Sequence, residues 1–430
     1  MTIPRDLGVP FDPTDPIQLA EFEGFGTDVP TSANLITAIQ SPPLIPNAAS
    51  VRAARMLRPG AISPLLDPNG PFPTPDAITP TPATKTFSRS GRRRVPITLP
   101  NVGQVDTWSF KDDFGAGADT WPAPTIRLKE GDLVHSIMSN SHGAHTIHHH
   151  GIEPTAMNDG VGHLTFEVGN VPGNDVGGAS YVYQWHAAEA GTYFYHCHRN
   201  TVLHFELGMY GMLIIDPAVP GAPFADGAAG AIFLGDDIAN YQSEAIWVAD
   251  DIDSRWRALD KSAGIALPDV DANGQPIFVP WGPFPANPRL NDFRPDGFVV
   301  SGVAANPADN NVIAGMGKTV IGGQKLLVRA LNASYCTSVW KFPSTLSGTV
   351  TAVDARTLGR SNNGFGSYSE PYSLASINHQ FTLTTAQRWD ILIDTAGSSF
   401  GTHMVEIEFR HWITNNILRT VRLPIVVASA

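Results

Sequence analysis

Short apolar runs alternate with turn residues along most of the chain from about residue 95. In WPAPTIRLKEGDLVHSIMSN, an extended apolar segment is followed by a turn at Glu130-Gly131-Asp132 and by a second extended segment. Further runs of this kind are HLTFEV, YVYQWHA, GTYFYHCH and MYGMLIIDP. Several short strands at this spacing are typical of a Greek-key β-sandwich. The pattern predicts a first β domain over residues 95–217.

A second β-rich domain is predicted over residues 231–430, after a linker of small residues, Pro and Gly at 218–230. Its clearest strands are GQKLLVRALNAS, GTVTAVDA, HQFTLTTAQRWDILID, HMVEIEFRHW and VRLPIVV. We find no long amphipathic-helix pattern and no repeat of solenoid length. The chain is therefore expected to be all-β, with two sandwich domains.

Residues 1–94 have a different character, because Pro and small residues dominate segments such as SPPLIPNAAS, and SGRRR at 90–94 ends them. We predict an extended Pro-rich N-terminal arm that lies on the body or on a neighbouring chain; a partly disordered leader is the alternative. The start, MTIPRDLGVPFDPTDP, is not typical of a signal peptide, so these residues assign no compartment.

Composition narrows the class of protein. The 430 residues include 40 glycines and 36 prolines, and 42% are hydrophobic, which suits two or three β domains with real cores. The formal net charge of −12 disfavours nucleic acid as a partner, since phosphate binding needs a basic surface. No apolar run is long enough to span a membrane. The two cysteines cannot form a disulfide framework, and Cys336 is expected to pack in the second core.

Histidine placement carries the chemistry, because 11 of the 14 histidines lie between His135 and His204. One group is HTIHHHG at 145–151. Side chains alternate along a strand, so His148 and His150 face the same way and can bind one metal ion or two adjacent ones. Taken alone, this group would also fit a surface histidine tract.

The second group is His196-Cys197-His198. By the same alternation, the two histidines share one face of a strand while the cysteine points to the other. One strand can therefore serve two metal centres on opposite sides, joined by covalent bonds through the cysteine.

His204 and Met209 follow this group, and together with Cys197 they offer a thiolate, an imidazole and a thioether. Two imidazoles, a thiolate and a weak axial thioether are the ligands of blue copper. The remaining imidazole must come from elsewhere, and His145 is the natural candidate. A lone cysteine or methionine is usually a packing residue, but this spacing is hard to explain by packing.

These motifs resemble those of the multicopper oxidases, whose copper-bearing domain shows H-x-x-H-x-H-G and then H-C-H followed by His and Met or Leu. HTIHHHG and HCHRNTVLHFELGM fit that pattern, and GIEPTAMNDGV and YVYQWHAAEAGTYFYHCH resemble its flanking segments. VRALNASY, VTAVDARTLG and TAQRWDILID look like the family's copper-free middle domain. The resemblance covers about residues 95–430.

The resemblance implies cupredoxin-like domains, a laccase-like activity and copper as cofactor. His145, Cys197, His204 and Met209 would bind type 1 copper. A type 2/type 3 cluster would be bound by four histidines: His148, His150, His196 and His198. A small-molecule or metal-ion reductant would be oxidised at the type 1 site, and electrons would pass through His196-Cys197-His198 to the cluster, where dioxygen is reduced to water. The family favours a periplasmic or extracellular location.

The sequence departs from the family in two ways. Five residues, Arg199 to Leu203, separate H-C-H from the next histidine instead of the usual three, which lengthens the ligand loop. A trinuclear cluster also needs eight histidines from two domains, whereas the first domain offers four, and His379, His403 and His411 of the second form no H-x-H pair. We therefore expect a homo-oligomer or a partner chain to complete the cluster, or a smaller site.

The smaller site would resemble that of copper nitrite reductases, with His150 and His196 as the local pair and His411 as a ligand visiting from the next subunit. The catalytic Asp of that family lies three residues after the first type 1 histidine, where this chain has His148, and this favours oxygen chemistry. A type 1 copper electron carrier is the third alternative. About one copper per chain favours the carrier, about two the reductase and more than two the oxidase.

The other histidines of this region are expected at the surface or behind the ligands: His135, His142, His149, His163 and His186. His149 should face away from the cluster, toward the type 1 side or solvent. Asp159 could orient water or a ligand histidine near the cluster, but the sequence favours a turn role in Asn158-Asp159-Gly160.

Overall fold

The computed structural model describes residues 83–139, 145–152, 154, 158–161, 181–259, 266–270, 276–278, 293–361 and 369–429. Residues 1–61 form one unit and residues 62–430 another, and all the described residues belong to the second. These described residues contain 25 β-strands and one α-helix, which confirms the expected all-β class. Among them, no helix is long and apolar enough to cross a membrane.

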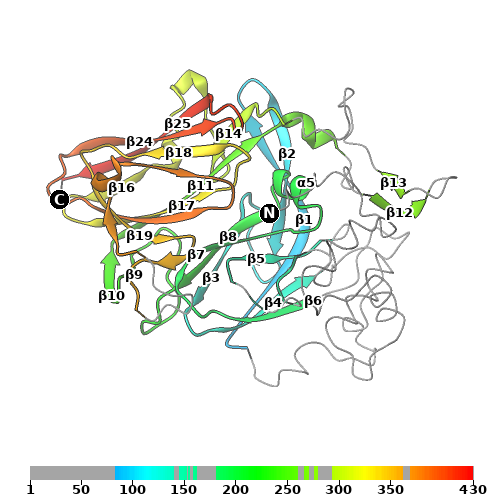
Figure 1. Ribbon diagram of the computed structural model, residues 1–430, viewed down its shortest axis with the longest axis horizontal. Coiled ribbons are helices and arrows are strands. Elements are labelled where there is room, and N and C mark those ends of the chain that lie inside the picture. The colour runs from blue at the N-terminus through cyan, green and yellow to red at the C-terminus, as the bar shows by residue number, and fades with distance from the viewer. Residues whose placement is uncertain are drawn as a thin grey trace, which may run out of the picture. The chain divides into compact units, whose positions relative to one another are not determined.

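The first sandwich consists of two four-stranded sheets (Figure 1). One has the order β2-β1-β4-β6, with β1 Lys85–Leu99, β2 Gly103–Asp112, β4 Leu133–Ser139 and β6 Tyr181–His186. The other has the order β3-β8-β7-β5, with β3 Ala123–Lys129, β5 His148–His150, β7 Gly191–His196 and β8 Tyr210–Asp216. Their inner faces meet through aromatic pairs such as Phe110 and Tyr195, whose ring centroids are 5.5 Å apart.

Strand β1 begins ten residues before the boundary proposed at Val95. It pairs with β4 over Lys85–Ser90 and with β2 as far as Leu99, and a register shift between Ser90 and Arg93 joins the two parts. SGRRR therefore lies inside a strand and not at the end of an arm. The charged residues and the register shift break the period-two pattern, which is why composition placed the boundary later. The proposed arm lies outside the described residues as far as residue 82.

The second sandwich packs an eight-stranded sheet, in the order β15-β14-β11-β17-β23-β19-β20 with β21 on β19, against a five-stranded sheet, β16-β25-β24-β18-β22. The first sheet comprises β11 Ser243–Ile252, β14 Gly297–Val300, β15 Val303–Ala304, β17 Lys325–Asn332, β19 Ser347–Val353, β20 Arg356–Thr357, β21 Tyr372–Ser373 and β23 Arg388–Asp394. The second comprises β16 Lys318–Ile321, β18 Thr337–Lys341, β22 Gln380–Leu383, β24 Gly401–Arg410 and β25 Ile417–Ala428. Cys336 is buried in the core between them, as expected.

Smaller elements complete the described chain. Two hairpins are formed by β9 Gly230–Leu234 with β10 Asp237–Tyr241, and by β12 Ala266–Val270 with β13 Pro276–Phe278. Four 3-10 helices are Ser254–Ala258, Pro307–Asp309, Ala314–Met316 and Leu374–Ile377. Residues 217–229, which include most of the proposed linker, contain no helix or strand.

The two sandwiches share an apolar cluster and an ionic network. Phe194, Phe205 and Tyr210 of the first sandwich pack in one buried cluster with Val248 and Leu331 of the second. Beside it lies a network of charged side chains from both sandwiches: Arg127, Asp216, Glu244, Arg329 and Asp390. The first sandwich is therefore attached to the second through its β7–β8 sheet, which also carries the histidine-rich motifs.

Candidate metal centre

Strand β7 runs between β8 and β5 and leads directly into His196-Cys197-His198. A side chain at Gly191, where β7 begins, would place its Cβ 2.4 Å from the carbonyl oxygen of Ala355, so only glycine fits there. His196 pairs with His148 of β5, and the Cys197 amide donates to the Met209 carbonyl (3.0 Å). The strand thus places its histidines against β5 and its cysteine beside the chain that follows α5 Thr201–Glu206.

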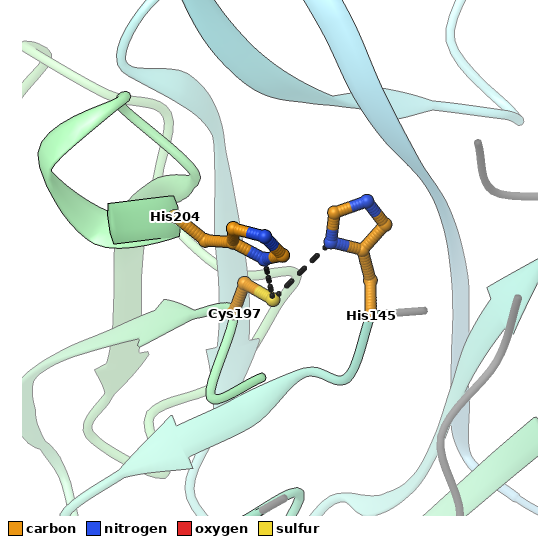
Figure 2. A group of neighbouring side chains, drawn as sticks. All are labelled: His145, Cys197 and His204. Atoms are coloured by element: carbon orange, nitrogen blue, oxygen red, sulfur yellow. Dashed lines mark hydrogen bonds between the residues drawn. The ribbon is translucent and has the colours of Figure 1, made fainter. Parts of the chain in front are cut away.

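His145, Cys197 and His204 converge in one buried group (Figure 2). The Nδ1 atoms of both histidines lie 3.4 Å from the cysteine Sγ, and the two imidazole centroids are 4.7 Å apart. Donor atoms bound to one metal ion at about 2.0–2.3 Å lie roughly 3–4 Å apart. The three donors therefore fit a single ion, and a thiolate with two imidazoles is the set that suits copper.

The lengthened loop contains helix α5, which carries His204 (Figure 2). Asn200 in the left-handed conformation (φ 47°) precedes the helix, and the residues from Leu203 to Glu206 are buried. The chain then turns at Gly208 (φ 111°). This position needs glycine, because a Cβ there would lie 2.3 Å from Trp121 Nε1. Met209 follows, fully buried, with its backbone opposite Cys197. The extra residues are thus absorbed by a helix, and the order of the candidate ligands is preserved.

Trp108 of β2 borders this group, and the motif-based reasoning did not include it. Its ring centroid is 5.3 Å from that of His204 and 6.4 Å from that of His145. It lies far upstream of the motifs and matches no ligand pattern, so only the pairing of the two sheets reveals its position.

Four imidazoles meet on the opposite face of β7. The ring centroid of His148 is 5.3 Å from that of His150, 5.1 Å from that of His196 and 5.2 Å from that of His198. One ring nitrogen from each of His148, His150 and His196 lies within a group spanning 4.8 Å. The alternation predicted for both motifs is therefore seen in the structure.

Backbone carbonyls orient two of these rings. His148 Nδ1 donates to the Asp159 carbonyl (2.6 Å), with the Asp159 carboxylate 3.3 Å away, and His196 Nδ1 donates to the Cys197 carbonyl (3.0 Å). A neutral imidazole that donates from Nδ1 has its lone pair on Nε2, which is the form that binds a metal. Asp159 thus serves both in the turn and in orienting a candidate ligand.

Gly160 brings that turn against β5. Its φ is 78°, and a Cβ there would lie 1.7 Å from the carbonyl oxygen of Ile147. The backbone of the turn therefore touches the segment between His145 and His148. The motif MNDG resembles the family at this point, but its physical reason, a close backbone approach, becomes visible only in the structure.

Burial favours the neutral form of three cluster imidazoles, those of His150, His196 and His198. Desolvation lowers the pKa of His150 to about 3, with a further contribution from the positive charge of Arg388. Burial also lowers the pKa of His196 and of His198. Neutral imidazole is the form required of a metal ligand, so the site is prepared for a cation.

The other histidines that the structure describes belong to neither group. His411 Nδ1 accepts the amides of Ile413 and Thr414 (both 3.2 Å), and its ring stacks on Trp412; it belongs to neither group among the described residues. His149 faces away from the cluster as predicted, but it enters the core between the sheets, where Nε2 contacts Ser136 Oγ (2.9 Å).

Of the other histidines expected away from the ligand positions, His135 contacts Gln184 (3.3 Å) and His186 is exposed. His142 and His163 lie outside the described residues.

Fold and donor sets together define a copper-binding β-sandwich protein of the cupredoxin type. Residues 111–219 match the model of the multicopper oxidase family. The resemblance seen in the motifs is thereby confirmed.

Curated relatives and a solved structure agree with this assignment. The chain is 26% identical to copper resistance protein A of Escherichia coli over 295 residues, which is 65% of this chain and 42% of that protein. It is 35% identical to copper resistance protein A of Pseudomonas syringae pv. tomato over 143 residues, 33% of this chain and 20% of that protein. The chain thus spans less than half the length of these relatives. The blue copper oxidase from Nitrosomonas europaea superposes with a TM-score of 0.52 at 18% identity, over 80% of this chain and 85% of that one, and shares the fold.

Proposed function

We propose that the chain is a copper-dependent oxidase that takes single electrons from a reductant and passes them to dioxygen. One group, His145, Cys197, His204 and Met209, would hold type 1 copper. The other, His148, His150, His196 and His198, would hold part of a type 2/type 3 cluster. The observation that supports this most is the single strand end that directs Cys197 to one group and its two neighbours to the other.

The two groups of ligands differ in burial: the type 1 ligands are closed off from solvent, and the cluster histidines are more open. Copper, when bound, supplies the redox chemistry. Cys197, His145 and Met209 are fully buried, which keeps water from the sulfur. His148, His150 and His198 are only partly buried, so a small molecule can reach them. The peptide bonds of His196-Cys197-His198 join the two sites by the shortest covalent route.

We further propose that a second copy of the chain supplies the histidines that the cluster lacks. Four imidazoles converge in one chain, and His379, His403 and His411 belong to neither donor group among the described residues. Two first sandwiches facing each other across a two-fold axis would contribute four histidines each. Sedimentation of the copper-loaded protein should show an oligomer, and a fully active monomer would exclude this arrangement.

Copper content and reoxidation test the function. The loaded chain should hold more than about two coppers and show a blue thiolate-to-copper absorption. After anaerobic reduction, dioxygen should restore the blue colour and nitrite should not. Recovery with nitrite alone would favour a nitrite reductase, and about one copper per chain, with neither acceptor effective, would favour an electron carrier. The reductant, proposed to be a small molecule or a metal ion, is to be sought by the same assay.

A further inference from the structure

Phe194 forms a floor beneath two of the cluster imidazoles. Its ring lies 4.5 Å from that of His150 at an interplanar angle of 26°, and 5.1 Å from that of His196 at 22°. The two imidazole centroids are 5.6 Å apart, too close for rings on opposite faces of a phenyl ring. Both therefore rest on the same face of Phe194, so a shift of this ring would move both together.

Arg388, the first residue of β23 in the second sandwich, packs against the Phe194 ring and fixes its position. Its guanidinium carbon lies 5.7 Å from the Phe194 ring centroid, within the range of a cation–π contact. Nε donates to the carbonyl of Thr192 on β7 (3.3 Å), two residues before the phenylalanine. Nη1 is fixed from behind by the Asp354 carboxylate (3.2 Å) and the Ala386 carbonyl (2.6 Å).

The same guanidinium reaches the turn after β5. A Cβ on Gly151 would lie 2.9 Å from Arg388 Nη2, so the absence of a side chain there lets the arginine approach. Arg356, also from the second sandwich, donates to the Gly151 carbonyl (3.2 Å) and pairs with Glu189 (3.2 Å). Arg388 and Arg356 thus contact the chain beside both strands that carry the cluster histidines, at Gly151 after β5 and at Thr192 and Glu189 in and before β7. Neither arginine touches Cys197 or His204 in any described contact.

We propose that Arg388 is a positioning residue for the histidine cluster: acting through Phe194 and Gly151, it sets the orientation of the His150 and His196 imidazoles without affecting the type 1 site. The second sandwich, which contributes no histidine to either group among its described residues, thereby gains a specific role in metal binding. This inference rests on the proposed function, because it takes the cluster to bind copper.

The test compares Arg388→Met with the unmodified full-length chain, each loaded with Cu(II). Retention of the non-blue copper against a chelator should fall by about 10- to 100-fold in the variant, with altered copper hyperfine splitting in its electron paramagnetic resonance spectrum. The blue absorption should be unchanged, which makes the type 1 site an internal control. Arg388→Lys keeps the charge but not the planar fork, so it should restore part of the retention.

Arg422→Met is the matched control, since its guanidinium pairs with Glu406 and Asn310 inside the second sandwich, and it should leave both copper signals unchanged. Unaltered non-blue copper in Arg388→Met would overturn the inference, as would parallel loss of both signals. If Arg388→Met does not fold, Arg388→Lys and Phe194→Leu carry the test, with selective loss of non-blue copper expected in both. An unmodified chain that binds no copper would instead refute the proposed function.

Discussion

At the scale of single residues, the site is prepared by its hydrogen bonds before any metal is bound. Carbonyl acceptors on Asp159 and Cys197 fix which nitrogen of His148 and His196 carries the proton. Because the acceptors belong to the backbone, no side-chain substitution at Asp159 can remove the shorter of these bonds. The orientation of the ligands is thus built into the turn and the strand end themselves.

Cys197→Ser should abolish the blue absorption, because the thiolate is replaced by a hydroxyl that is a weaker copper ligand. Visible absorption of the copper-loaded protein measures the effect. Cys336→Ser is the matched control, since the other cysteine is buried in the second core, and it should keep the colour. A blue Cys197→Ser protein would contradict the assignment.

Gly160→Ala should destabilise the first sandwich and weaken copper binding by the histidine cluster, because the new Cβ would meet the Ile147 carbonyl at 1.7 Å. The expected loss is about 1–3 kcal/mol in the free energy of unfolding, measured by denaturant titration. Gly103→Ala shares the positive φ but has nothing within 4 Å of its Cβ, so it isolates the backbone strain from the clash. Equal losses in the two variants would show that the close approach is unimportant.

Among the elements, the strands were predicted best, because the alternation of side chains indicates which residues share a face. It correctly placed His148 and His150 on one face and Cys197 opposite its neighbours. Helix α5 was not expected, because TVLHFE is only six residues long, and it is held by burial against the sandwich. Strand β1 was missed in part for a related reason: its arginines hide a register that the neighbouring strands impose.

Tyr335→Phe should loosen helix α5, since the Tyr335 hydroxyl donates to the Val202 carbonyl (2.5 Å) and links the second sandwich to the loop that carries His204. We expect the free energy of unfolding to fall by about 1 kcal/mol, while the blue absorption is retained because no ligand is lost. Denaturant titration followed by fluorescence and by colour measures both. Unchanged stability would mean that the hydrogen bond is replaced by water at no cost.

At the scale of the whole molecule, a buried ionic network joins the two sandwiches. Arg127 of β3 pairs with Asp216 (2.9 Å) and with Glu244 of β11 (2.8 Å), and Glu244 also binds Arg329 of β17 (2.7 Å). Thr192 of β7 donates to Asp390 (2.5 Å). These contacts, like those of Arg388 across 196 residues of sequence, could not be predicted because no local pattern specifies which sandwich faces meet.

Acid should therefore weaken the attachment of the sandwiches. Burial alone would raise the pKa of Glu244, but Arg329 and Arg127 outweigh it and lower this pKa to about 2. A carboxylate whose pKa is lower in the folded than in the unfolded chain stabilises the fold at any pH above the unfolded pKa. This stabilisation, on the order of 3 kcal/mol, is lost as the pH falls from about 4.5 toward 2. Denaturant titrations between these limits measure it. Glu244→Gln should be less stable at neutral pH and should show a flatter acid limb; an identical limb would contradict this origin.

The place of β5 at the end of its sheet has a consequence for metal uptake. Only three residues long, it pairs with β7 alone among the described strands, whereas β7 is held on both sides. Short edge strands detach by local opening at a lower free energy than central ones. Hydrogen–deuterium exchange should therefore be faster at the β5 amides than at those of β7. We expect copper to reach the partly buried cluster histidines when β5 opens locally, while the type 1 site stays intact. Equal exchange in the two strands would mean that copper enters by another route.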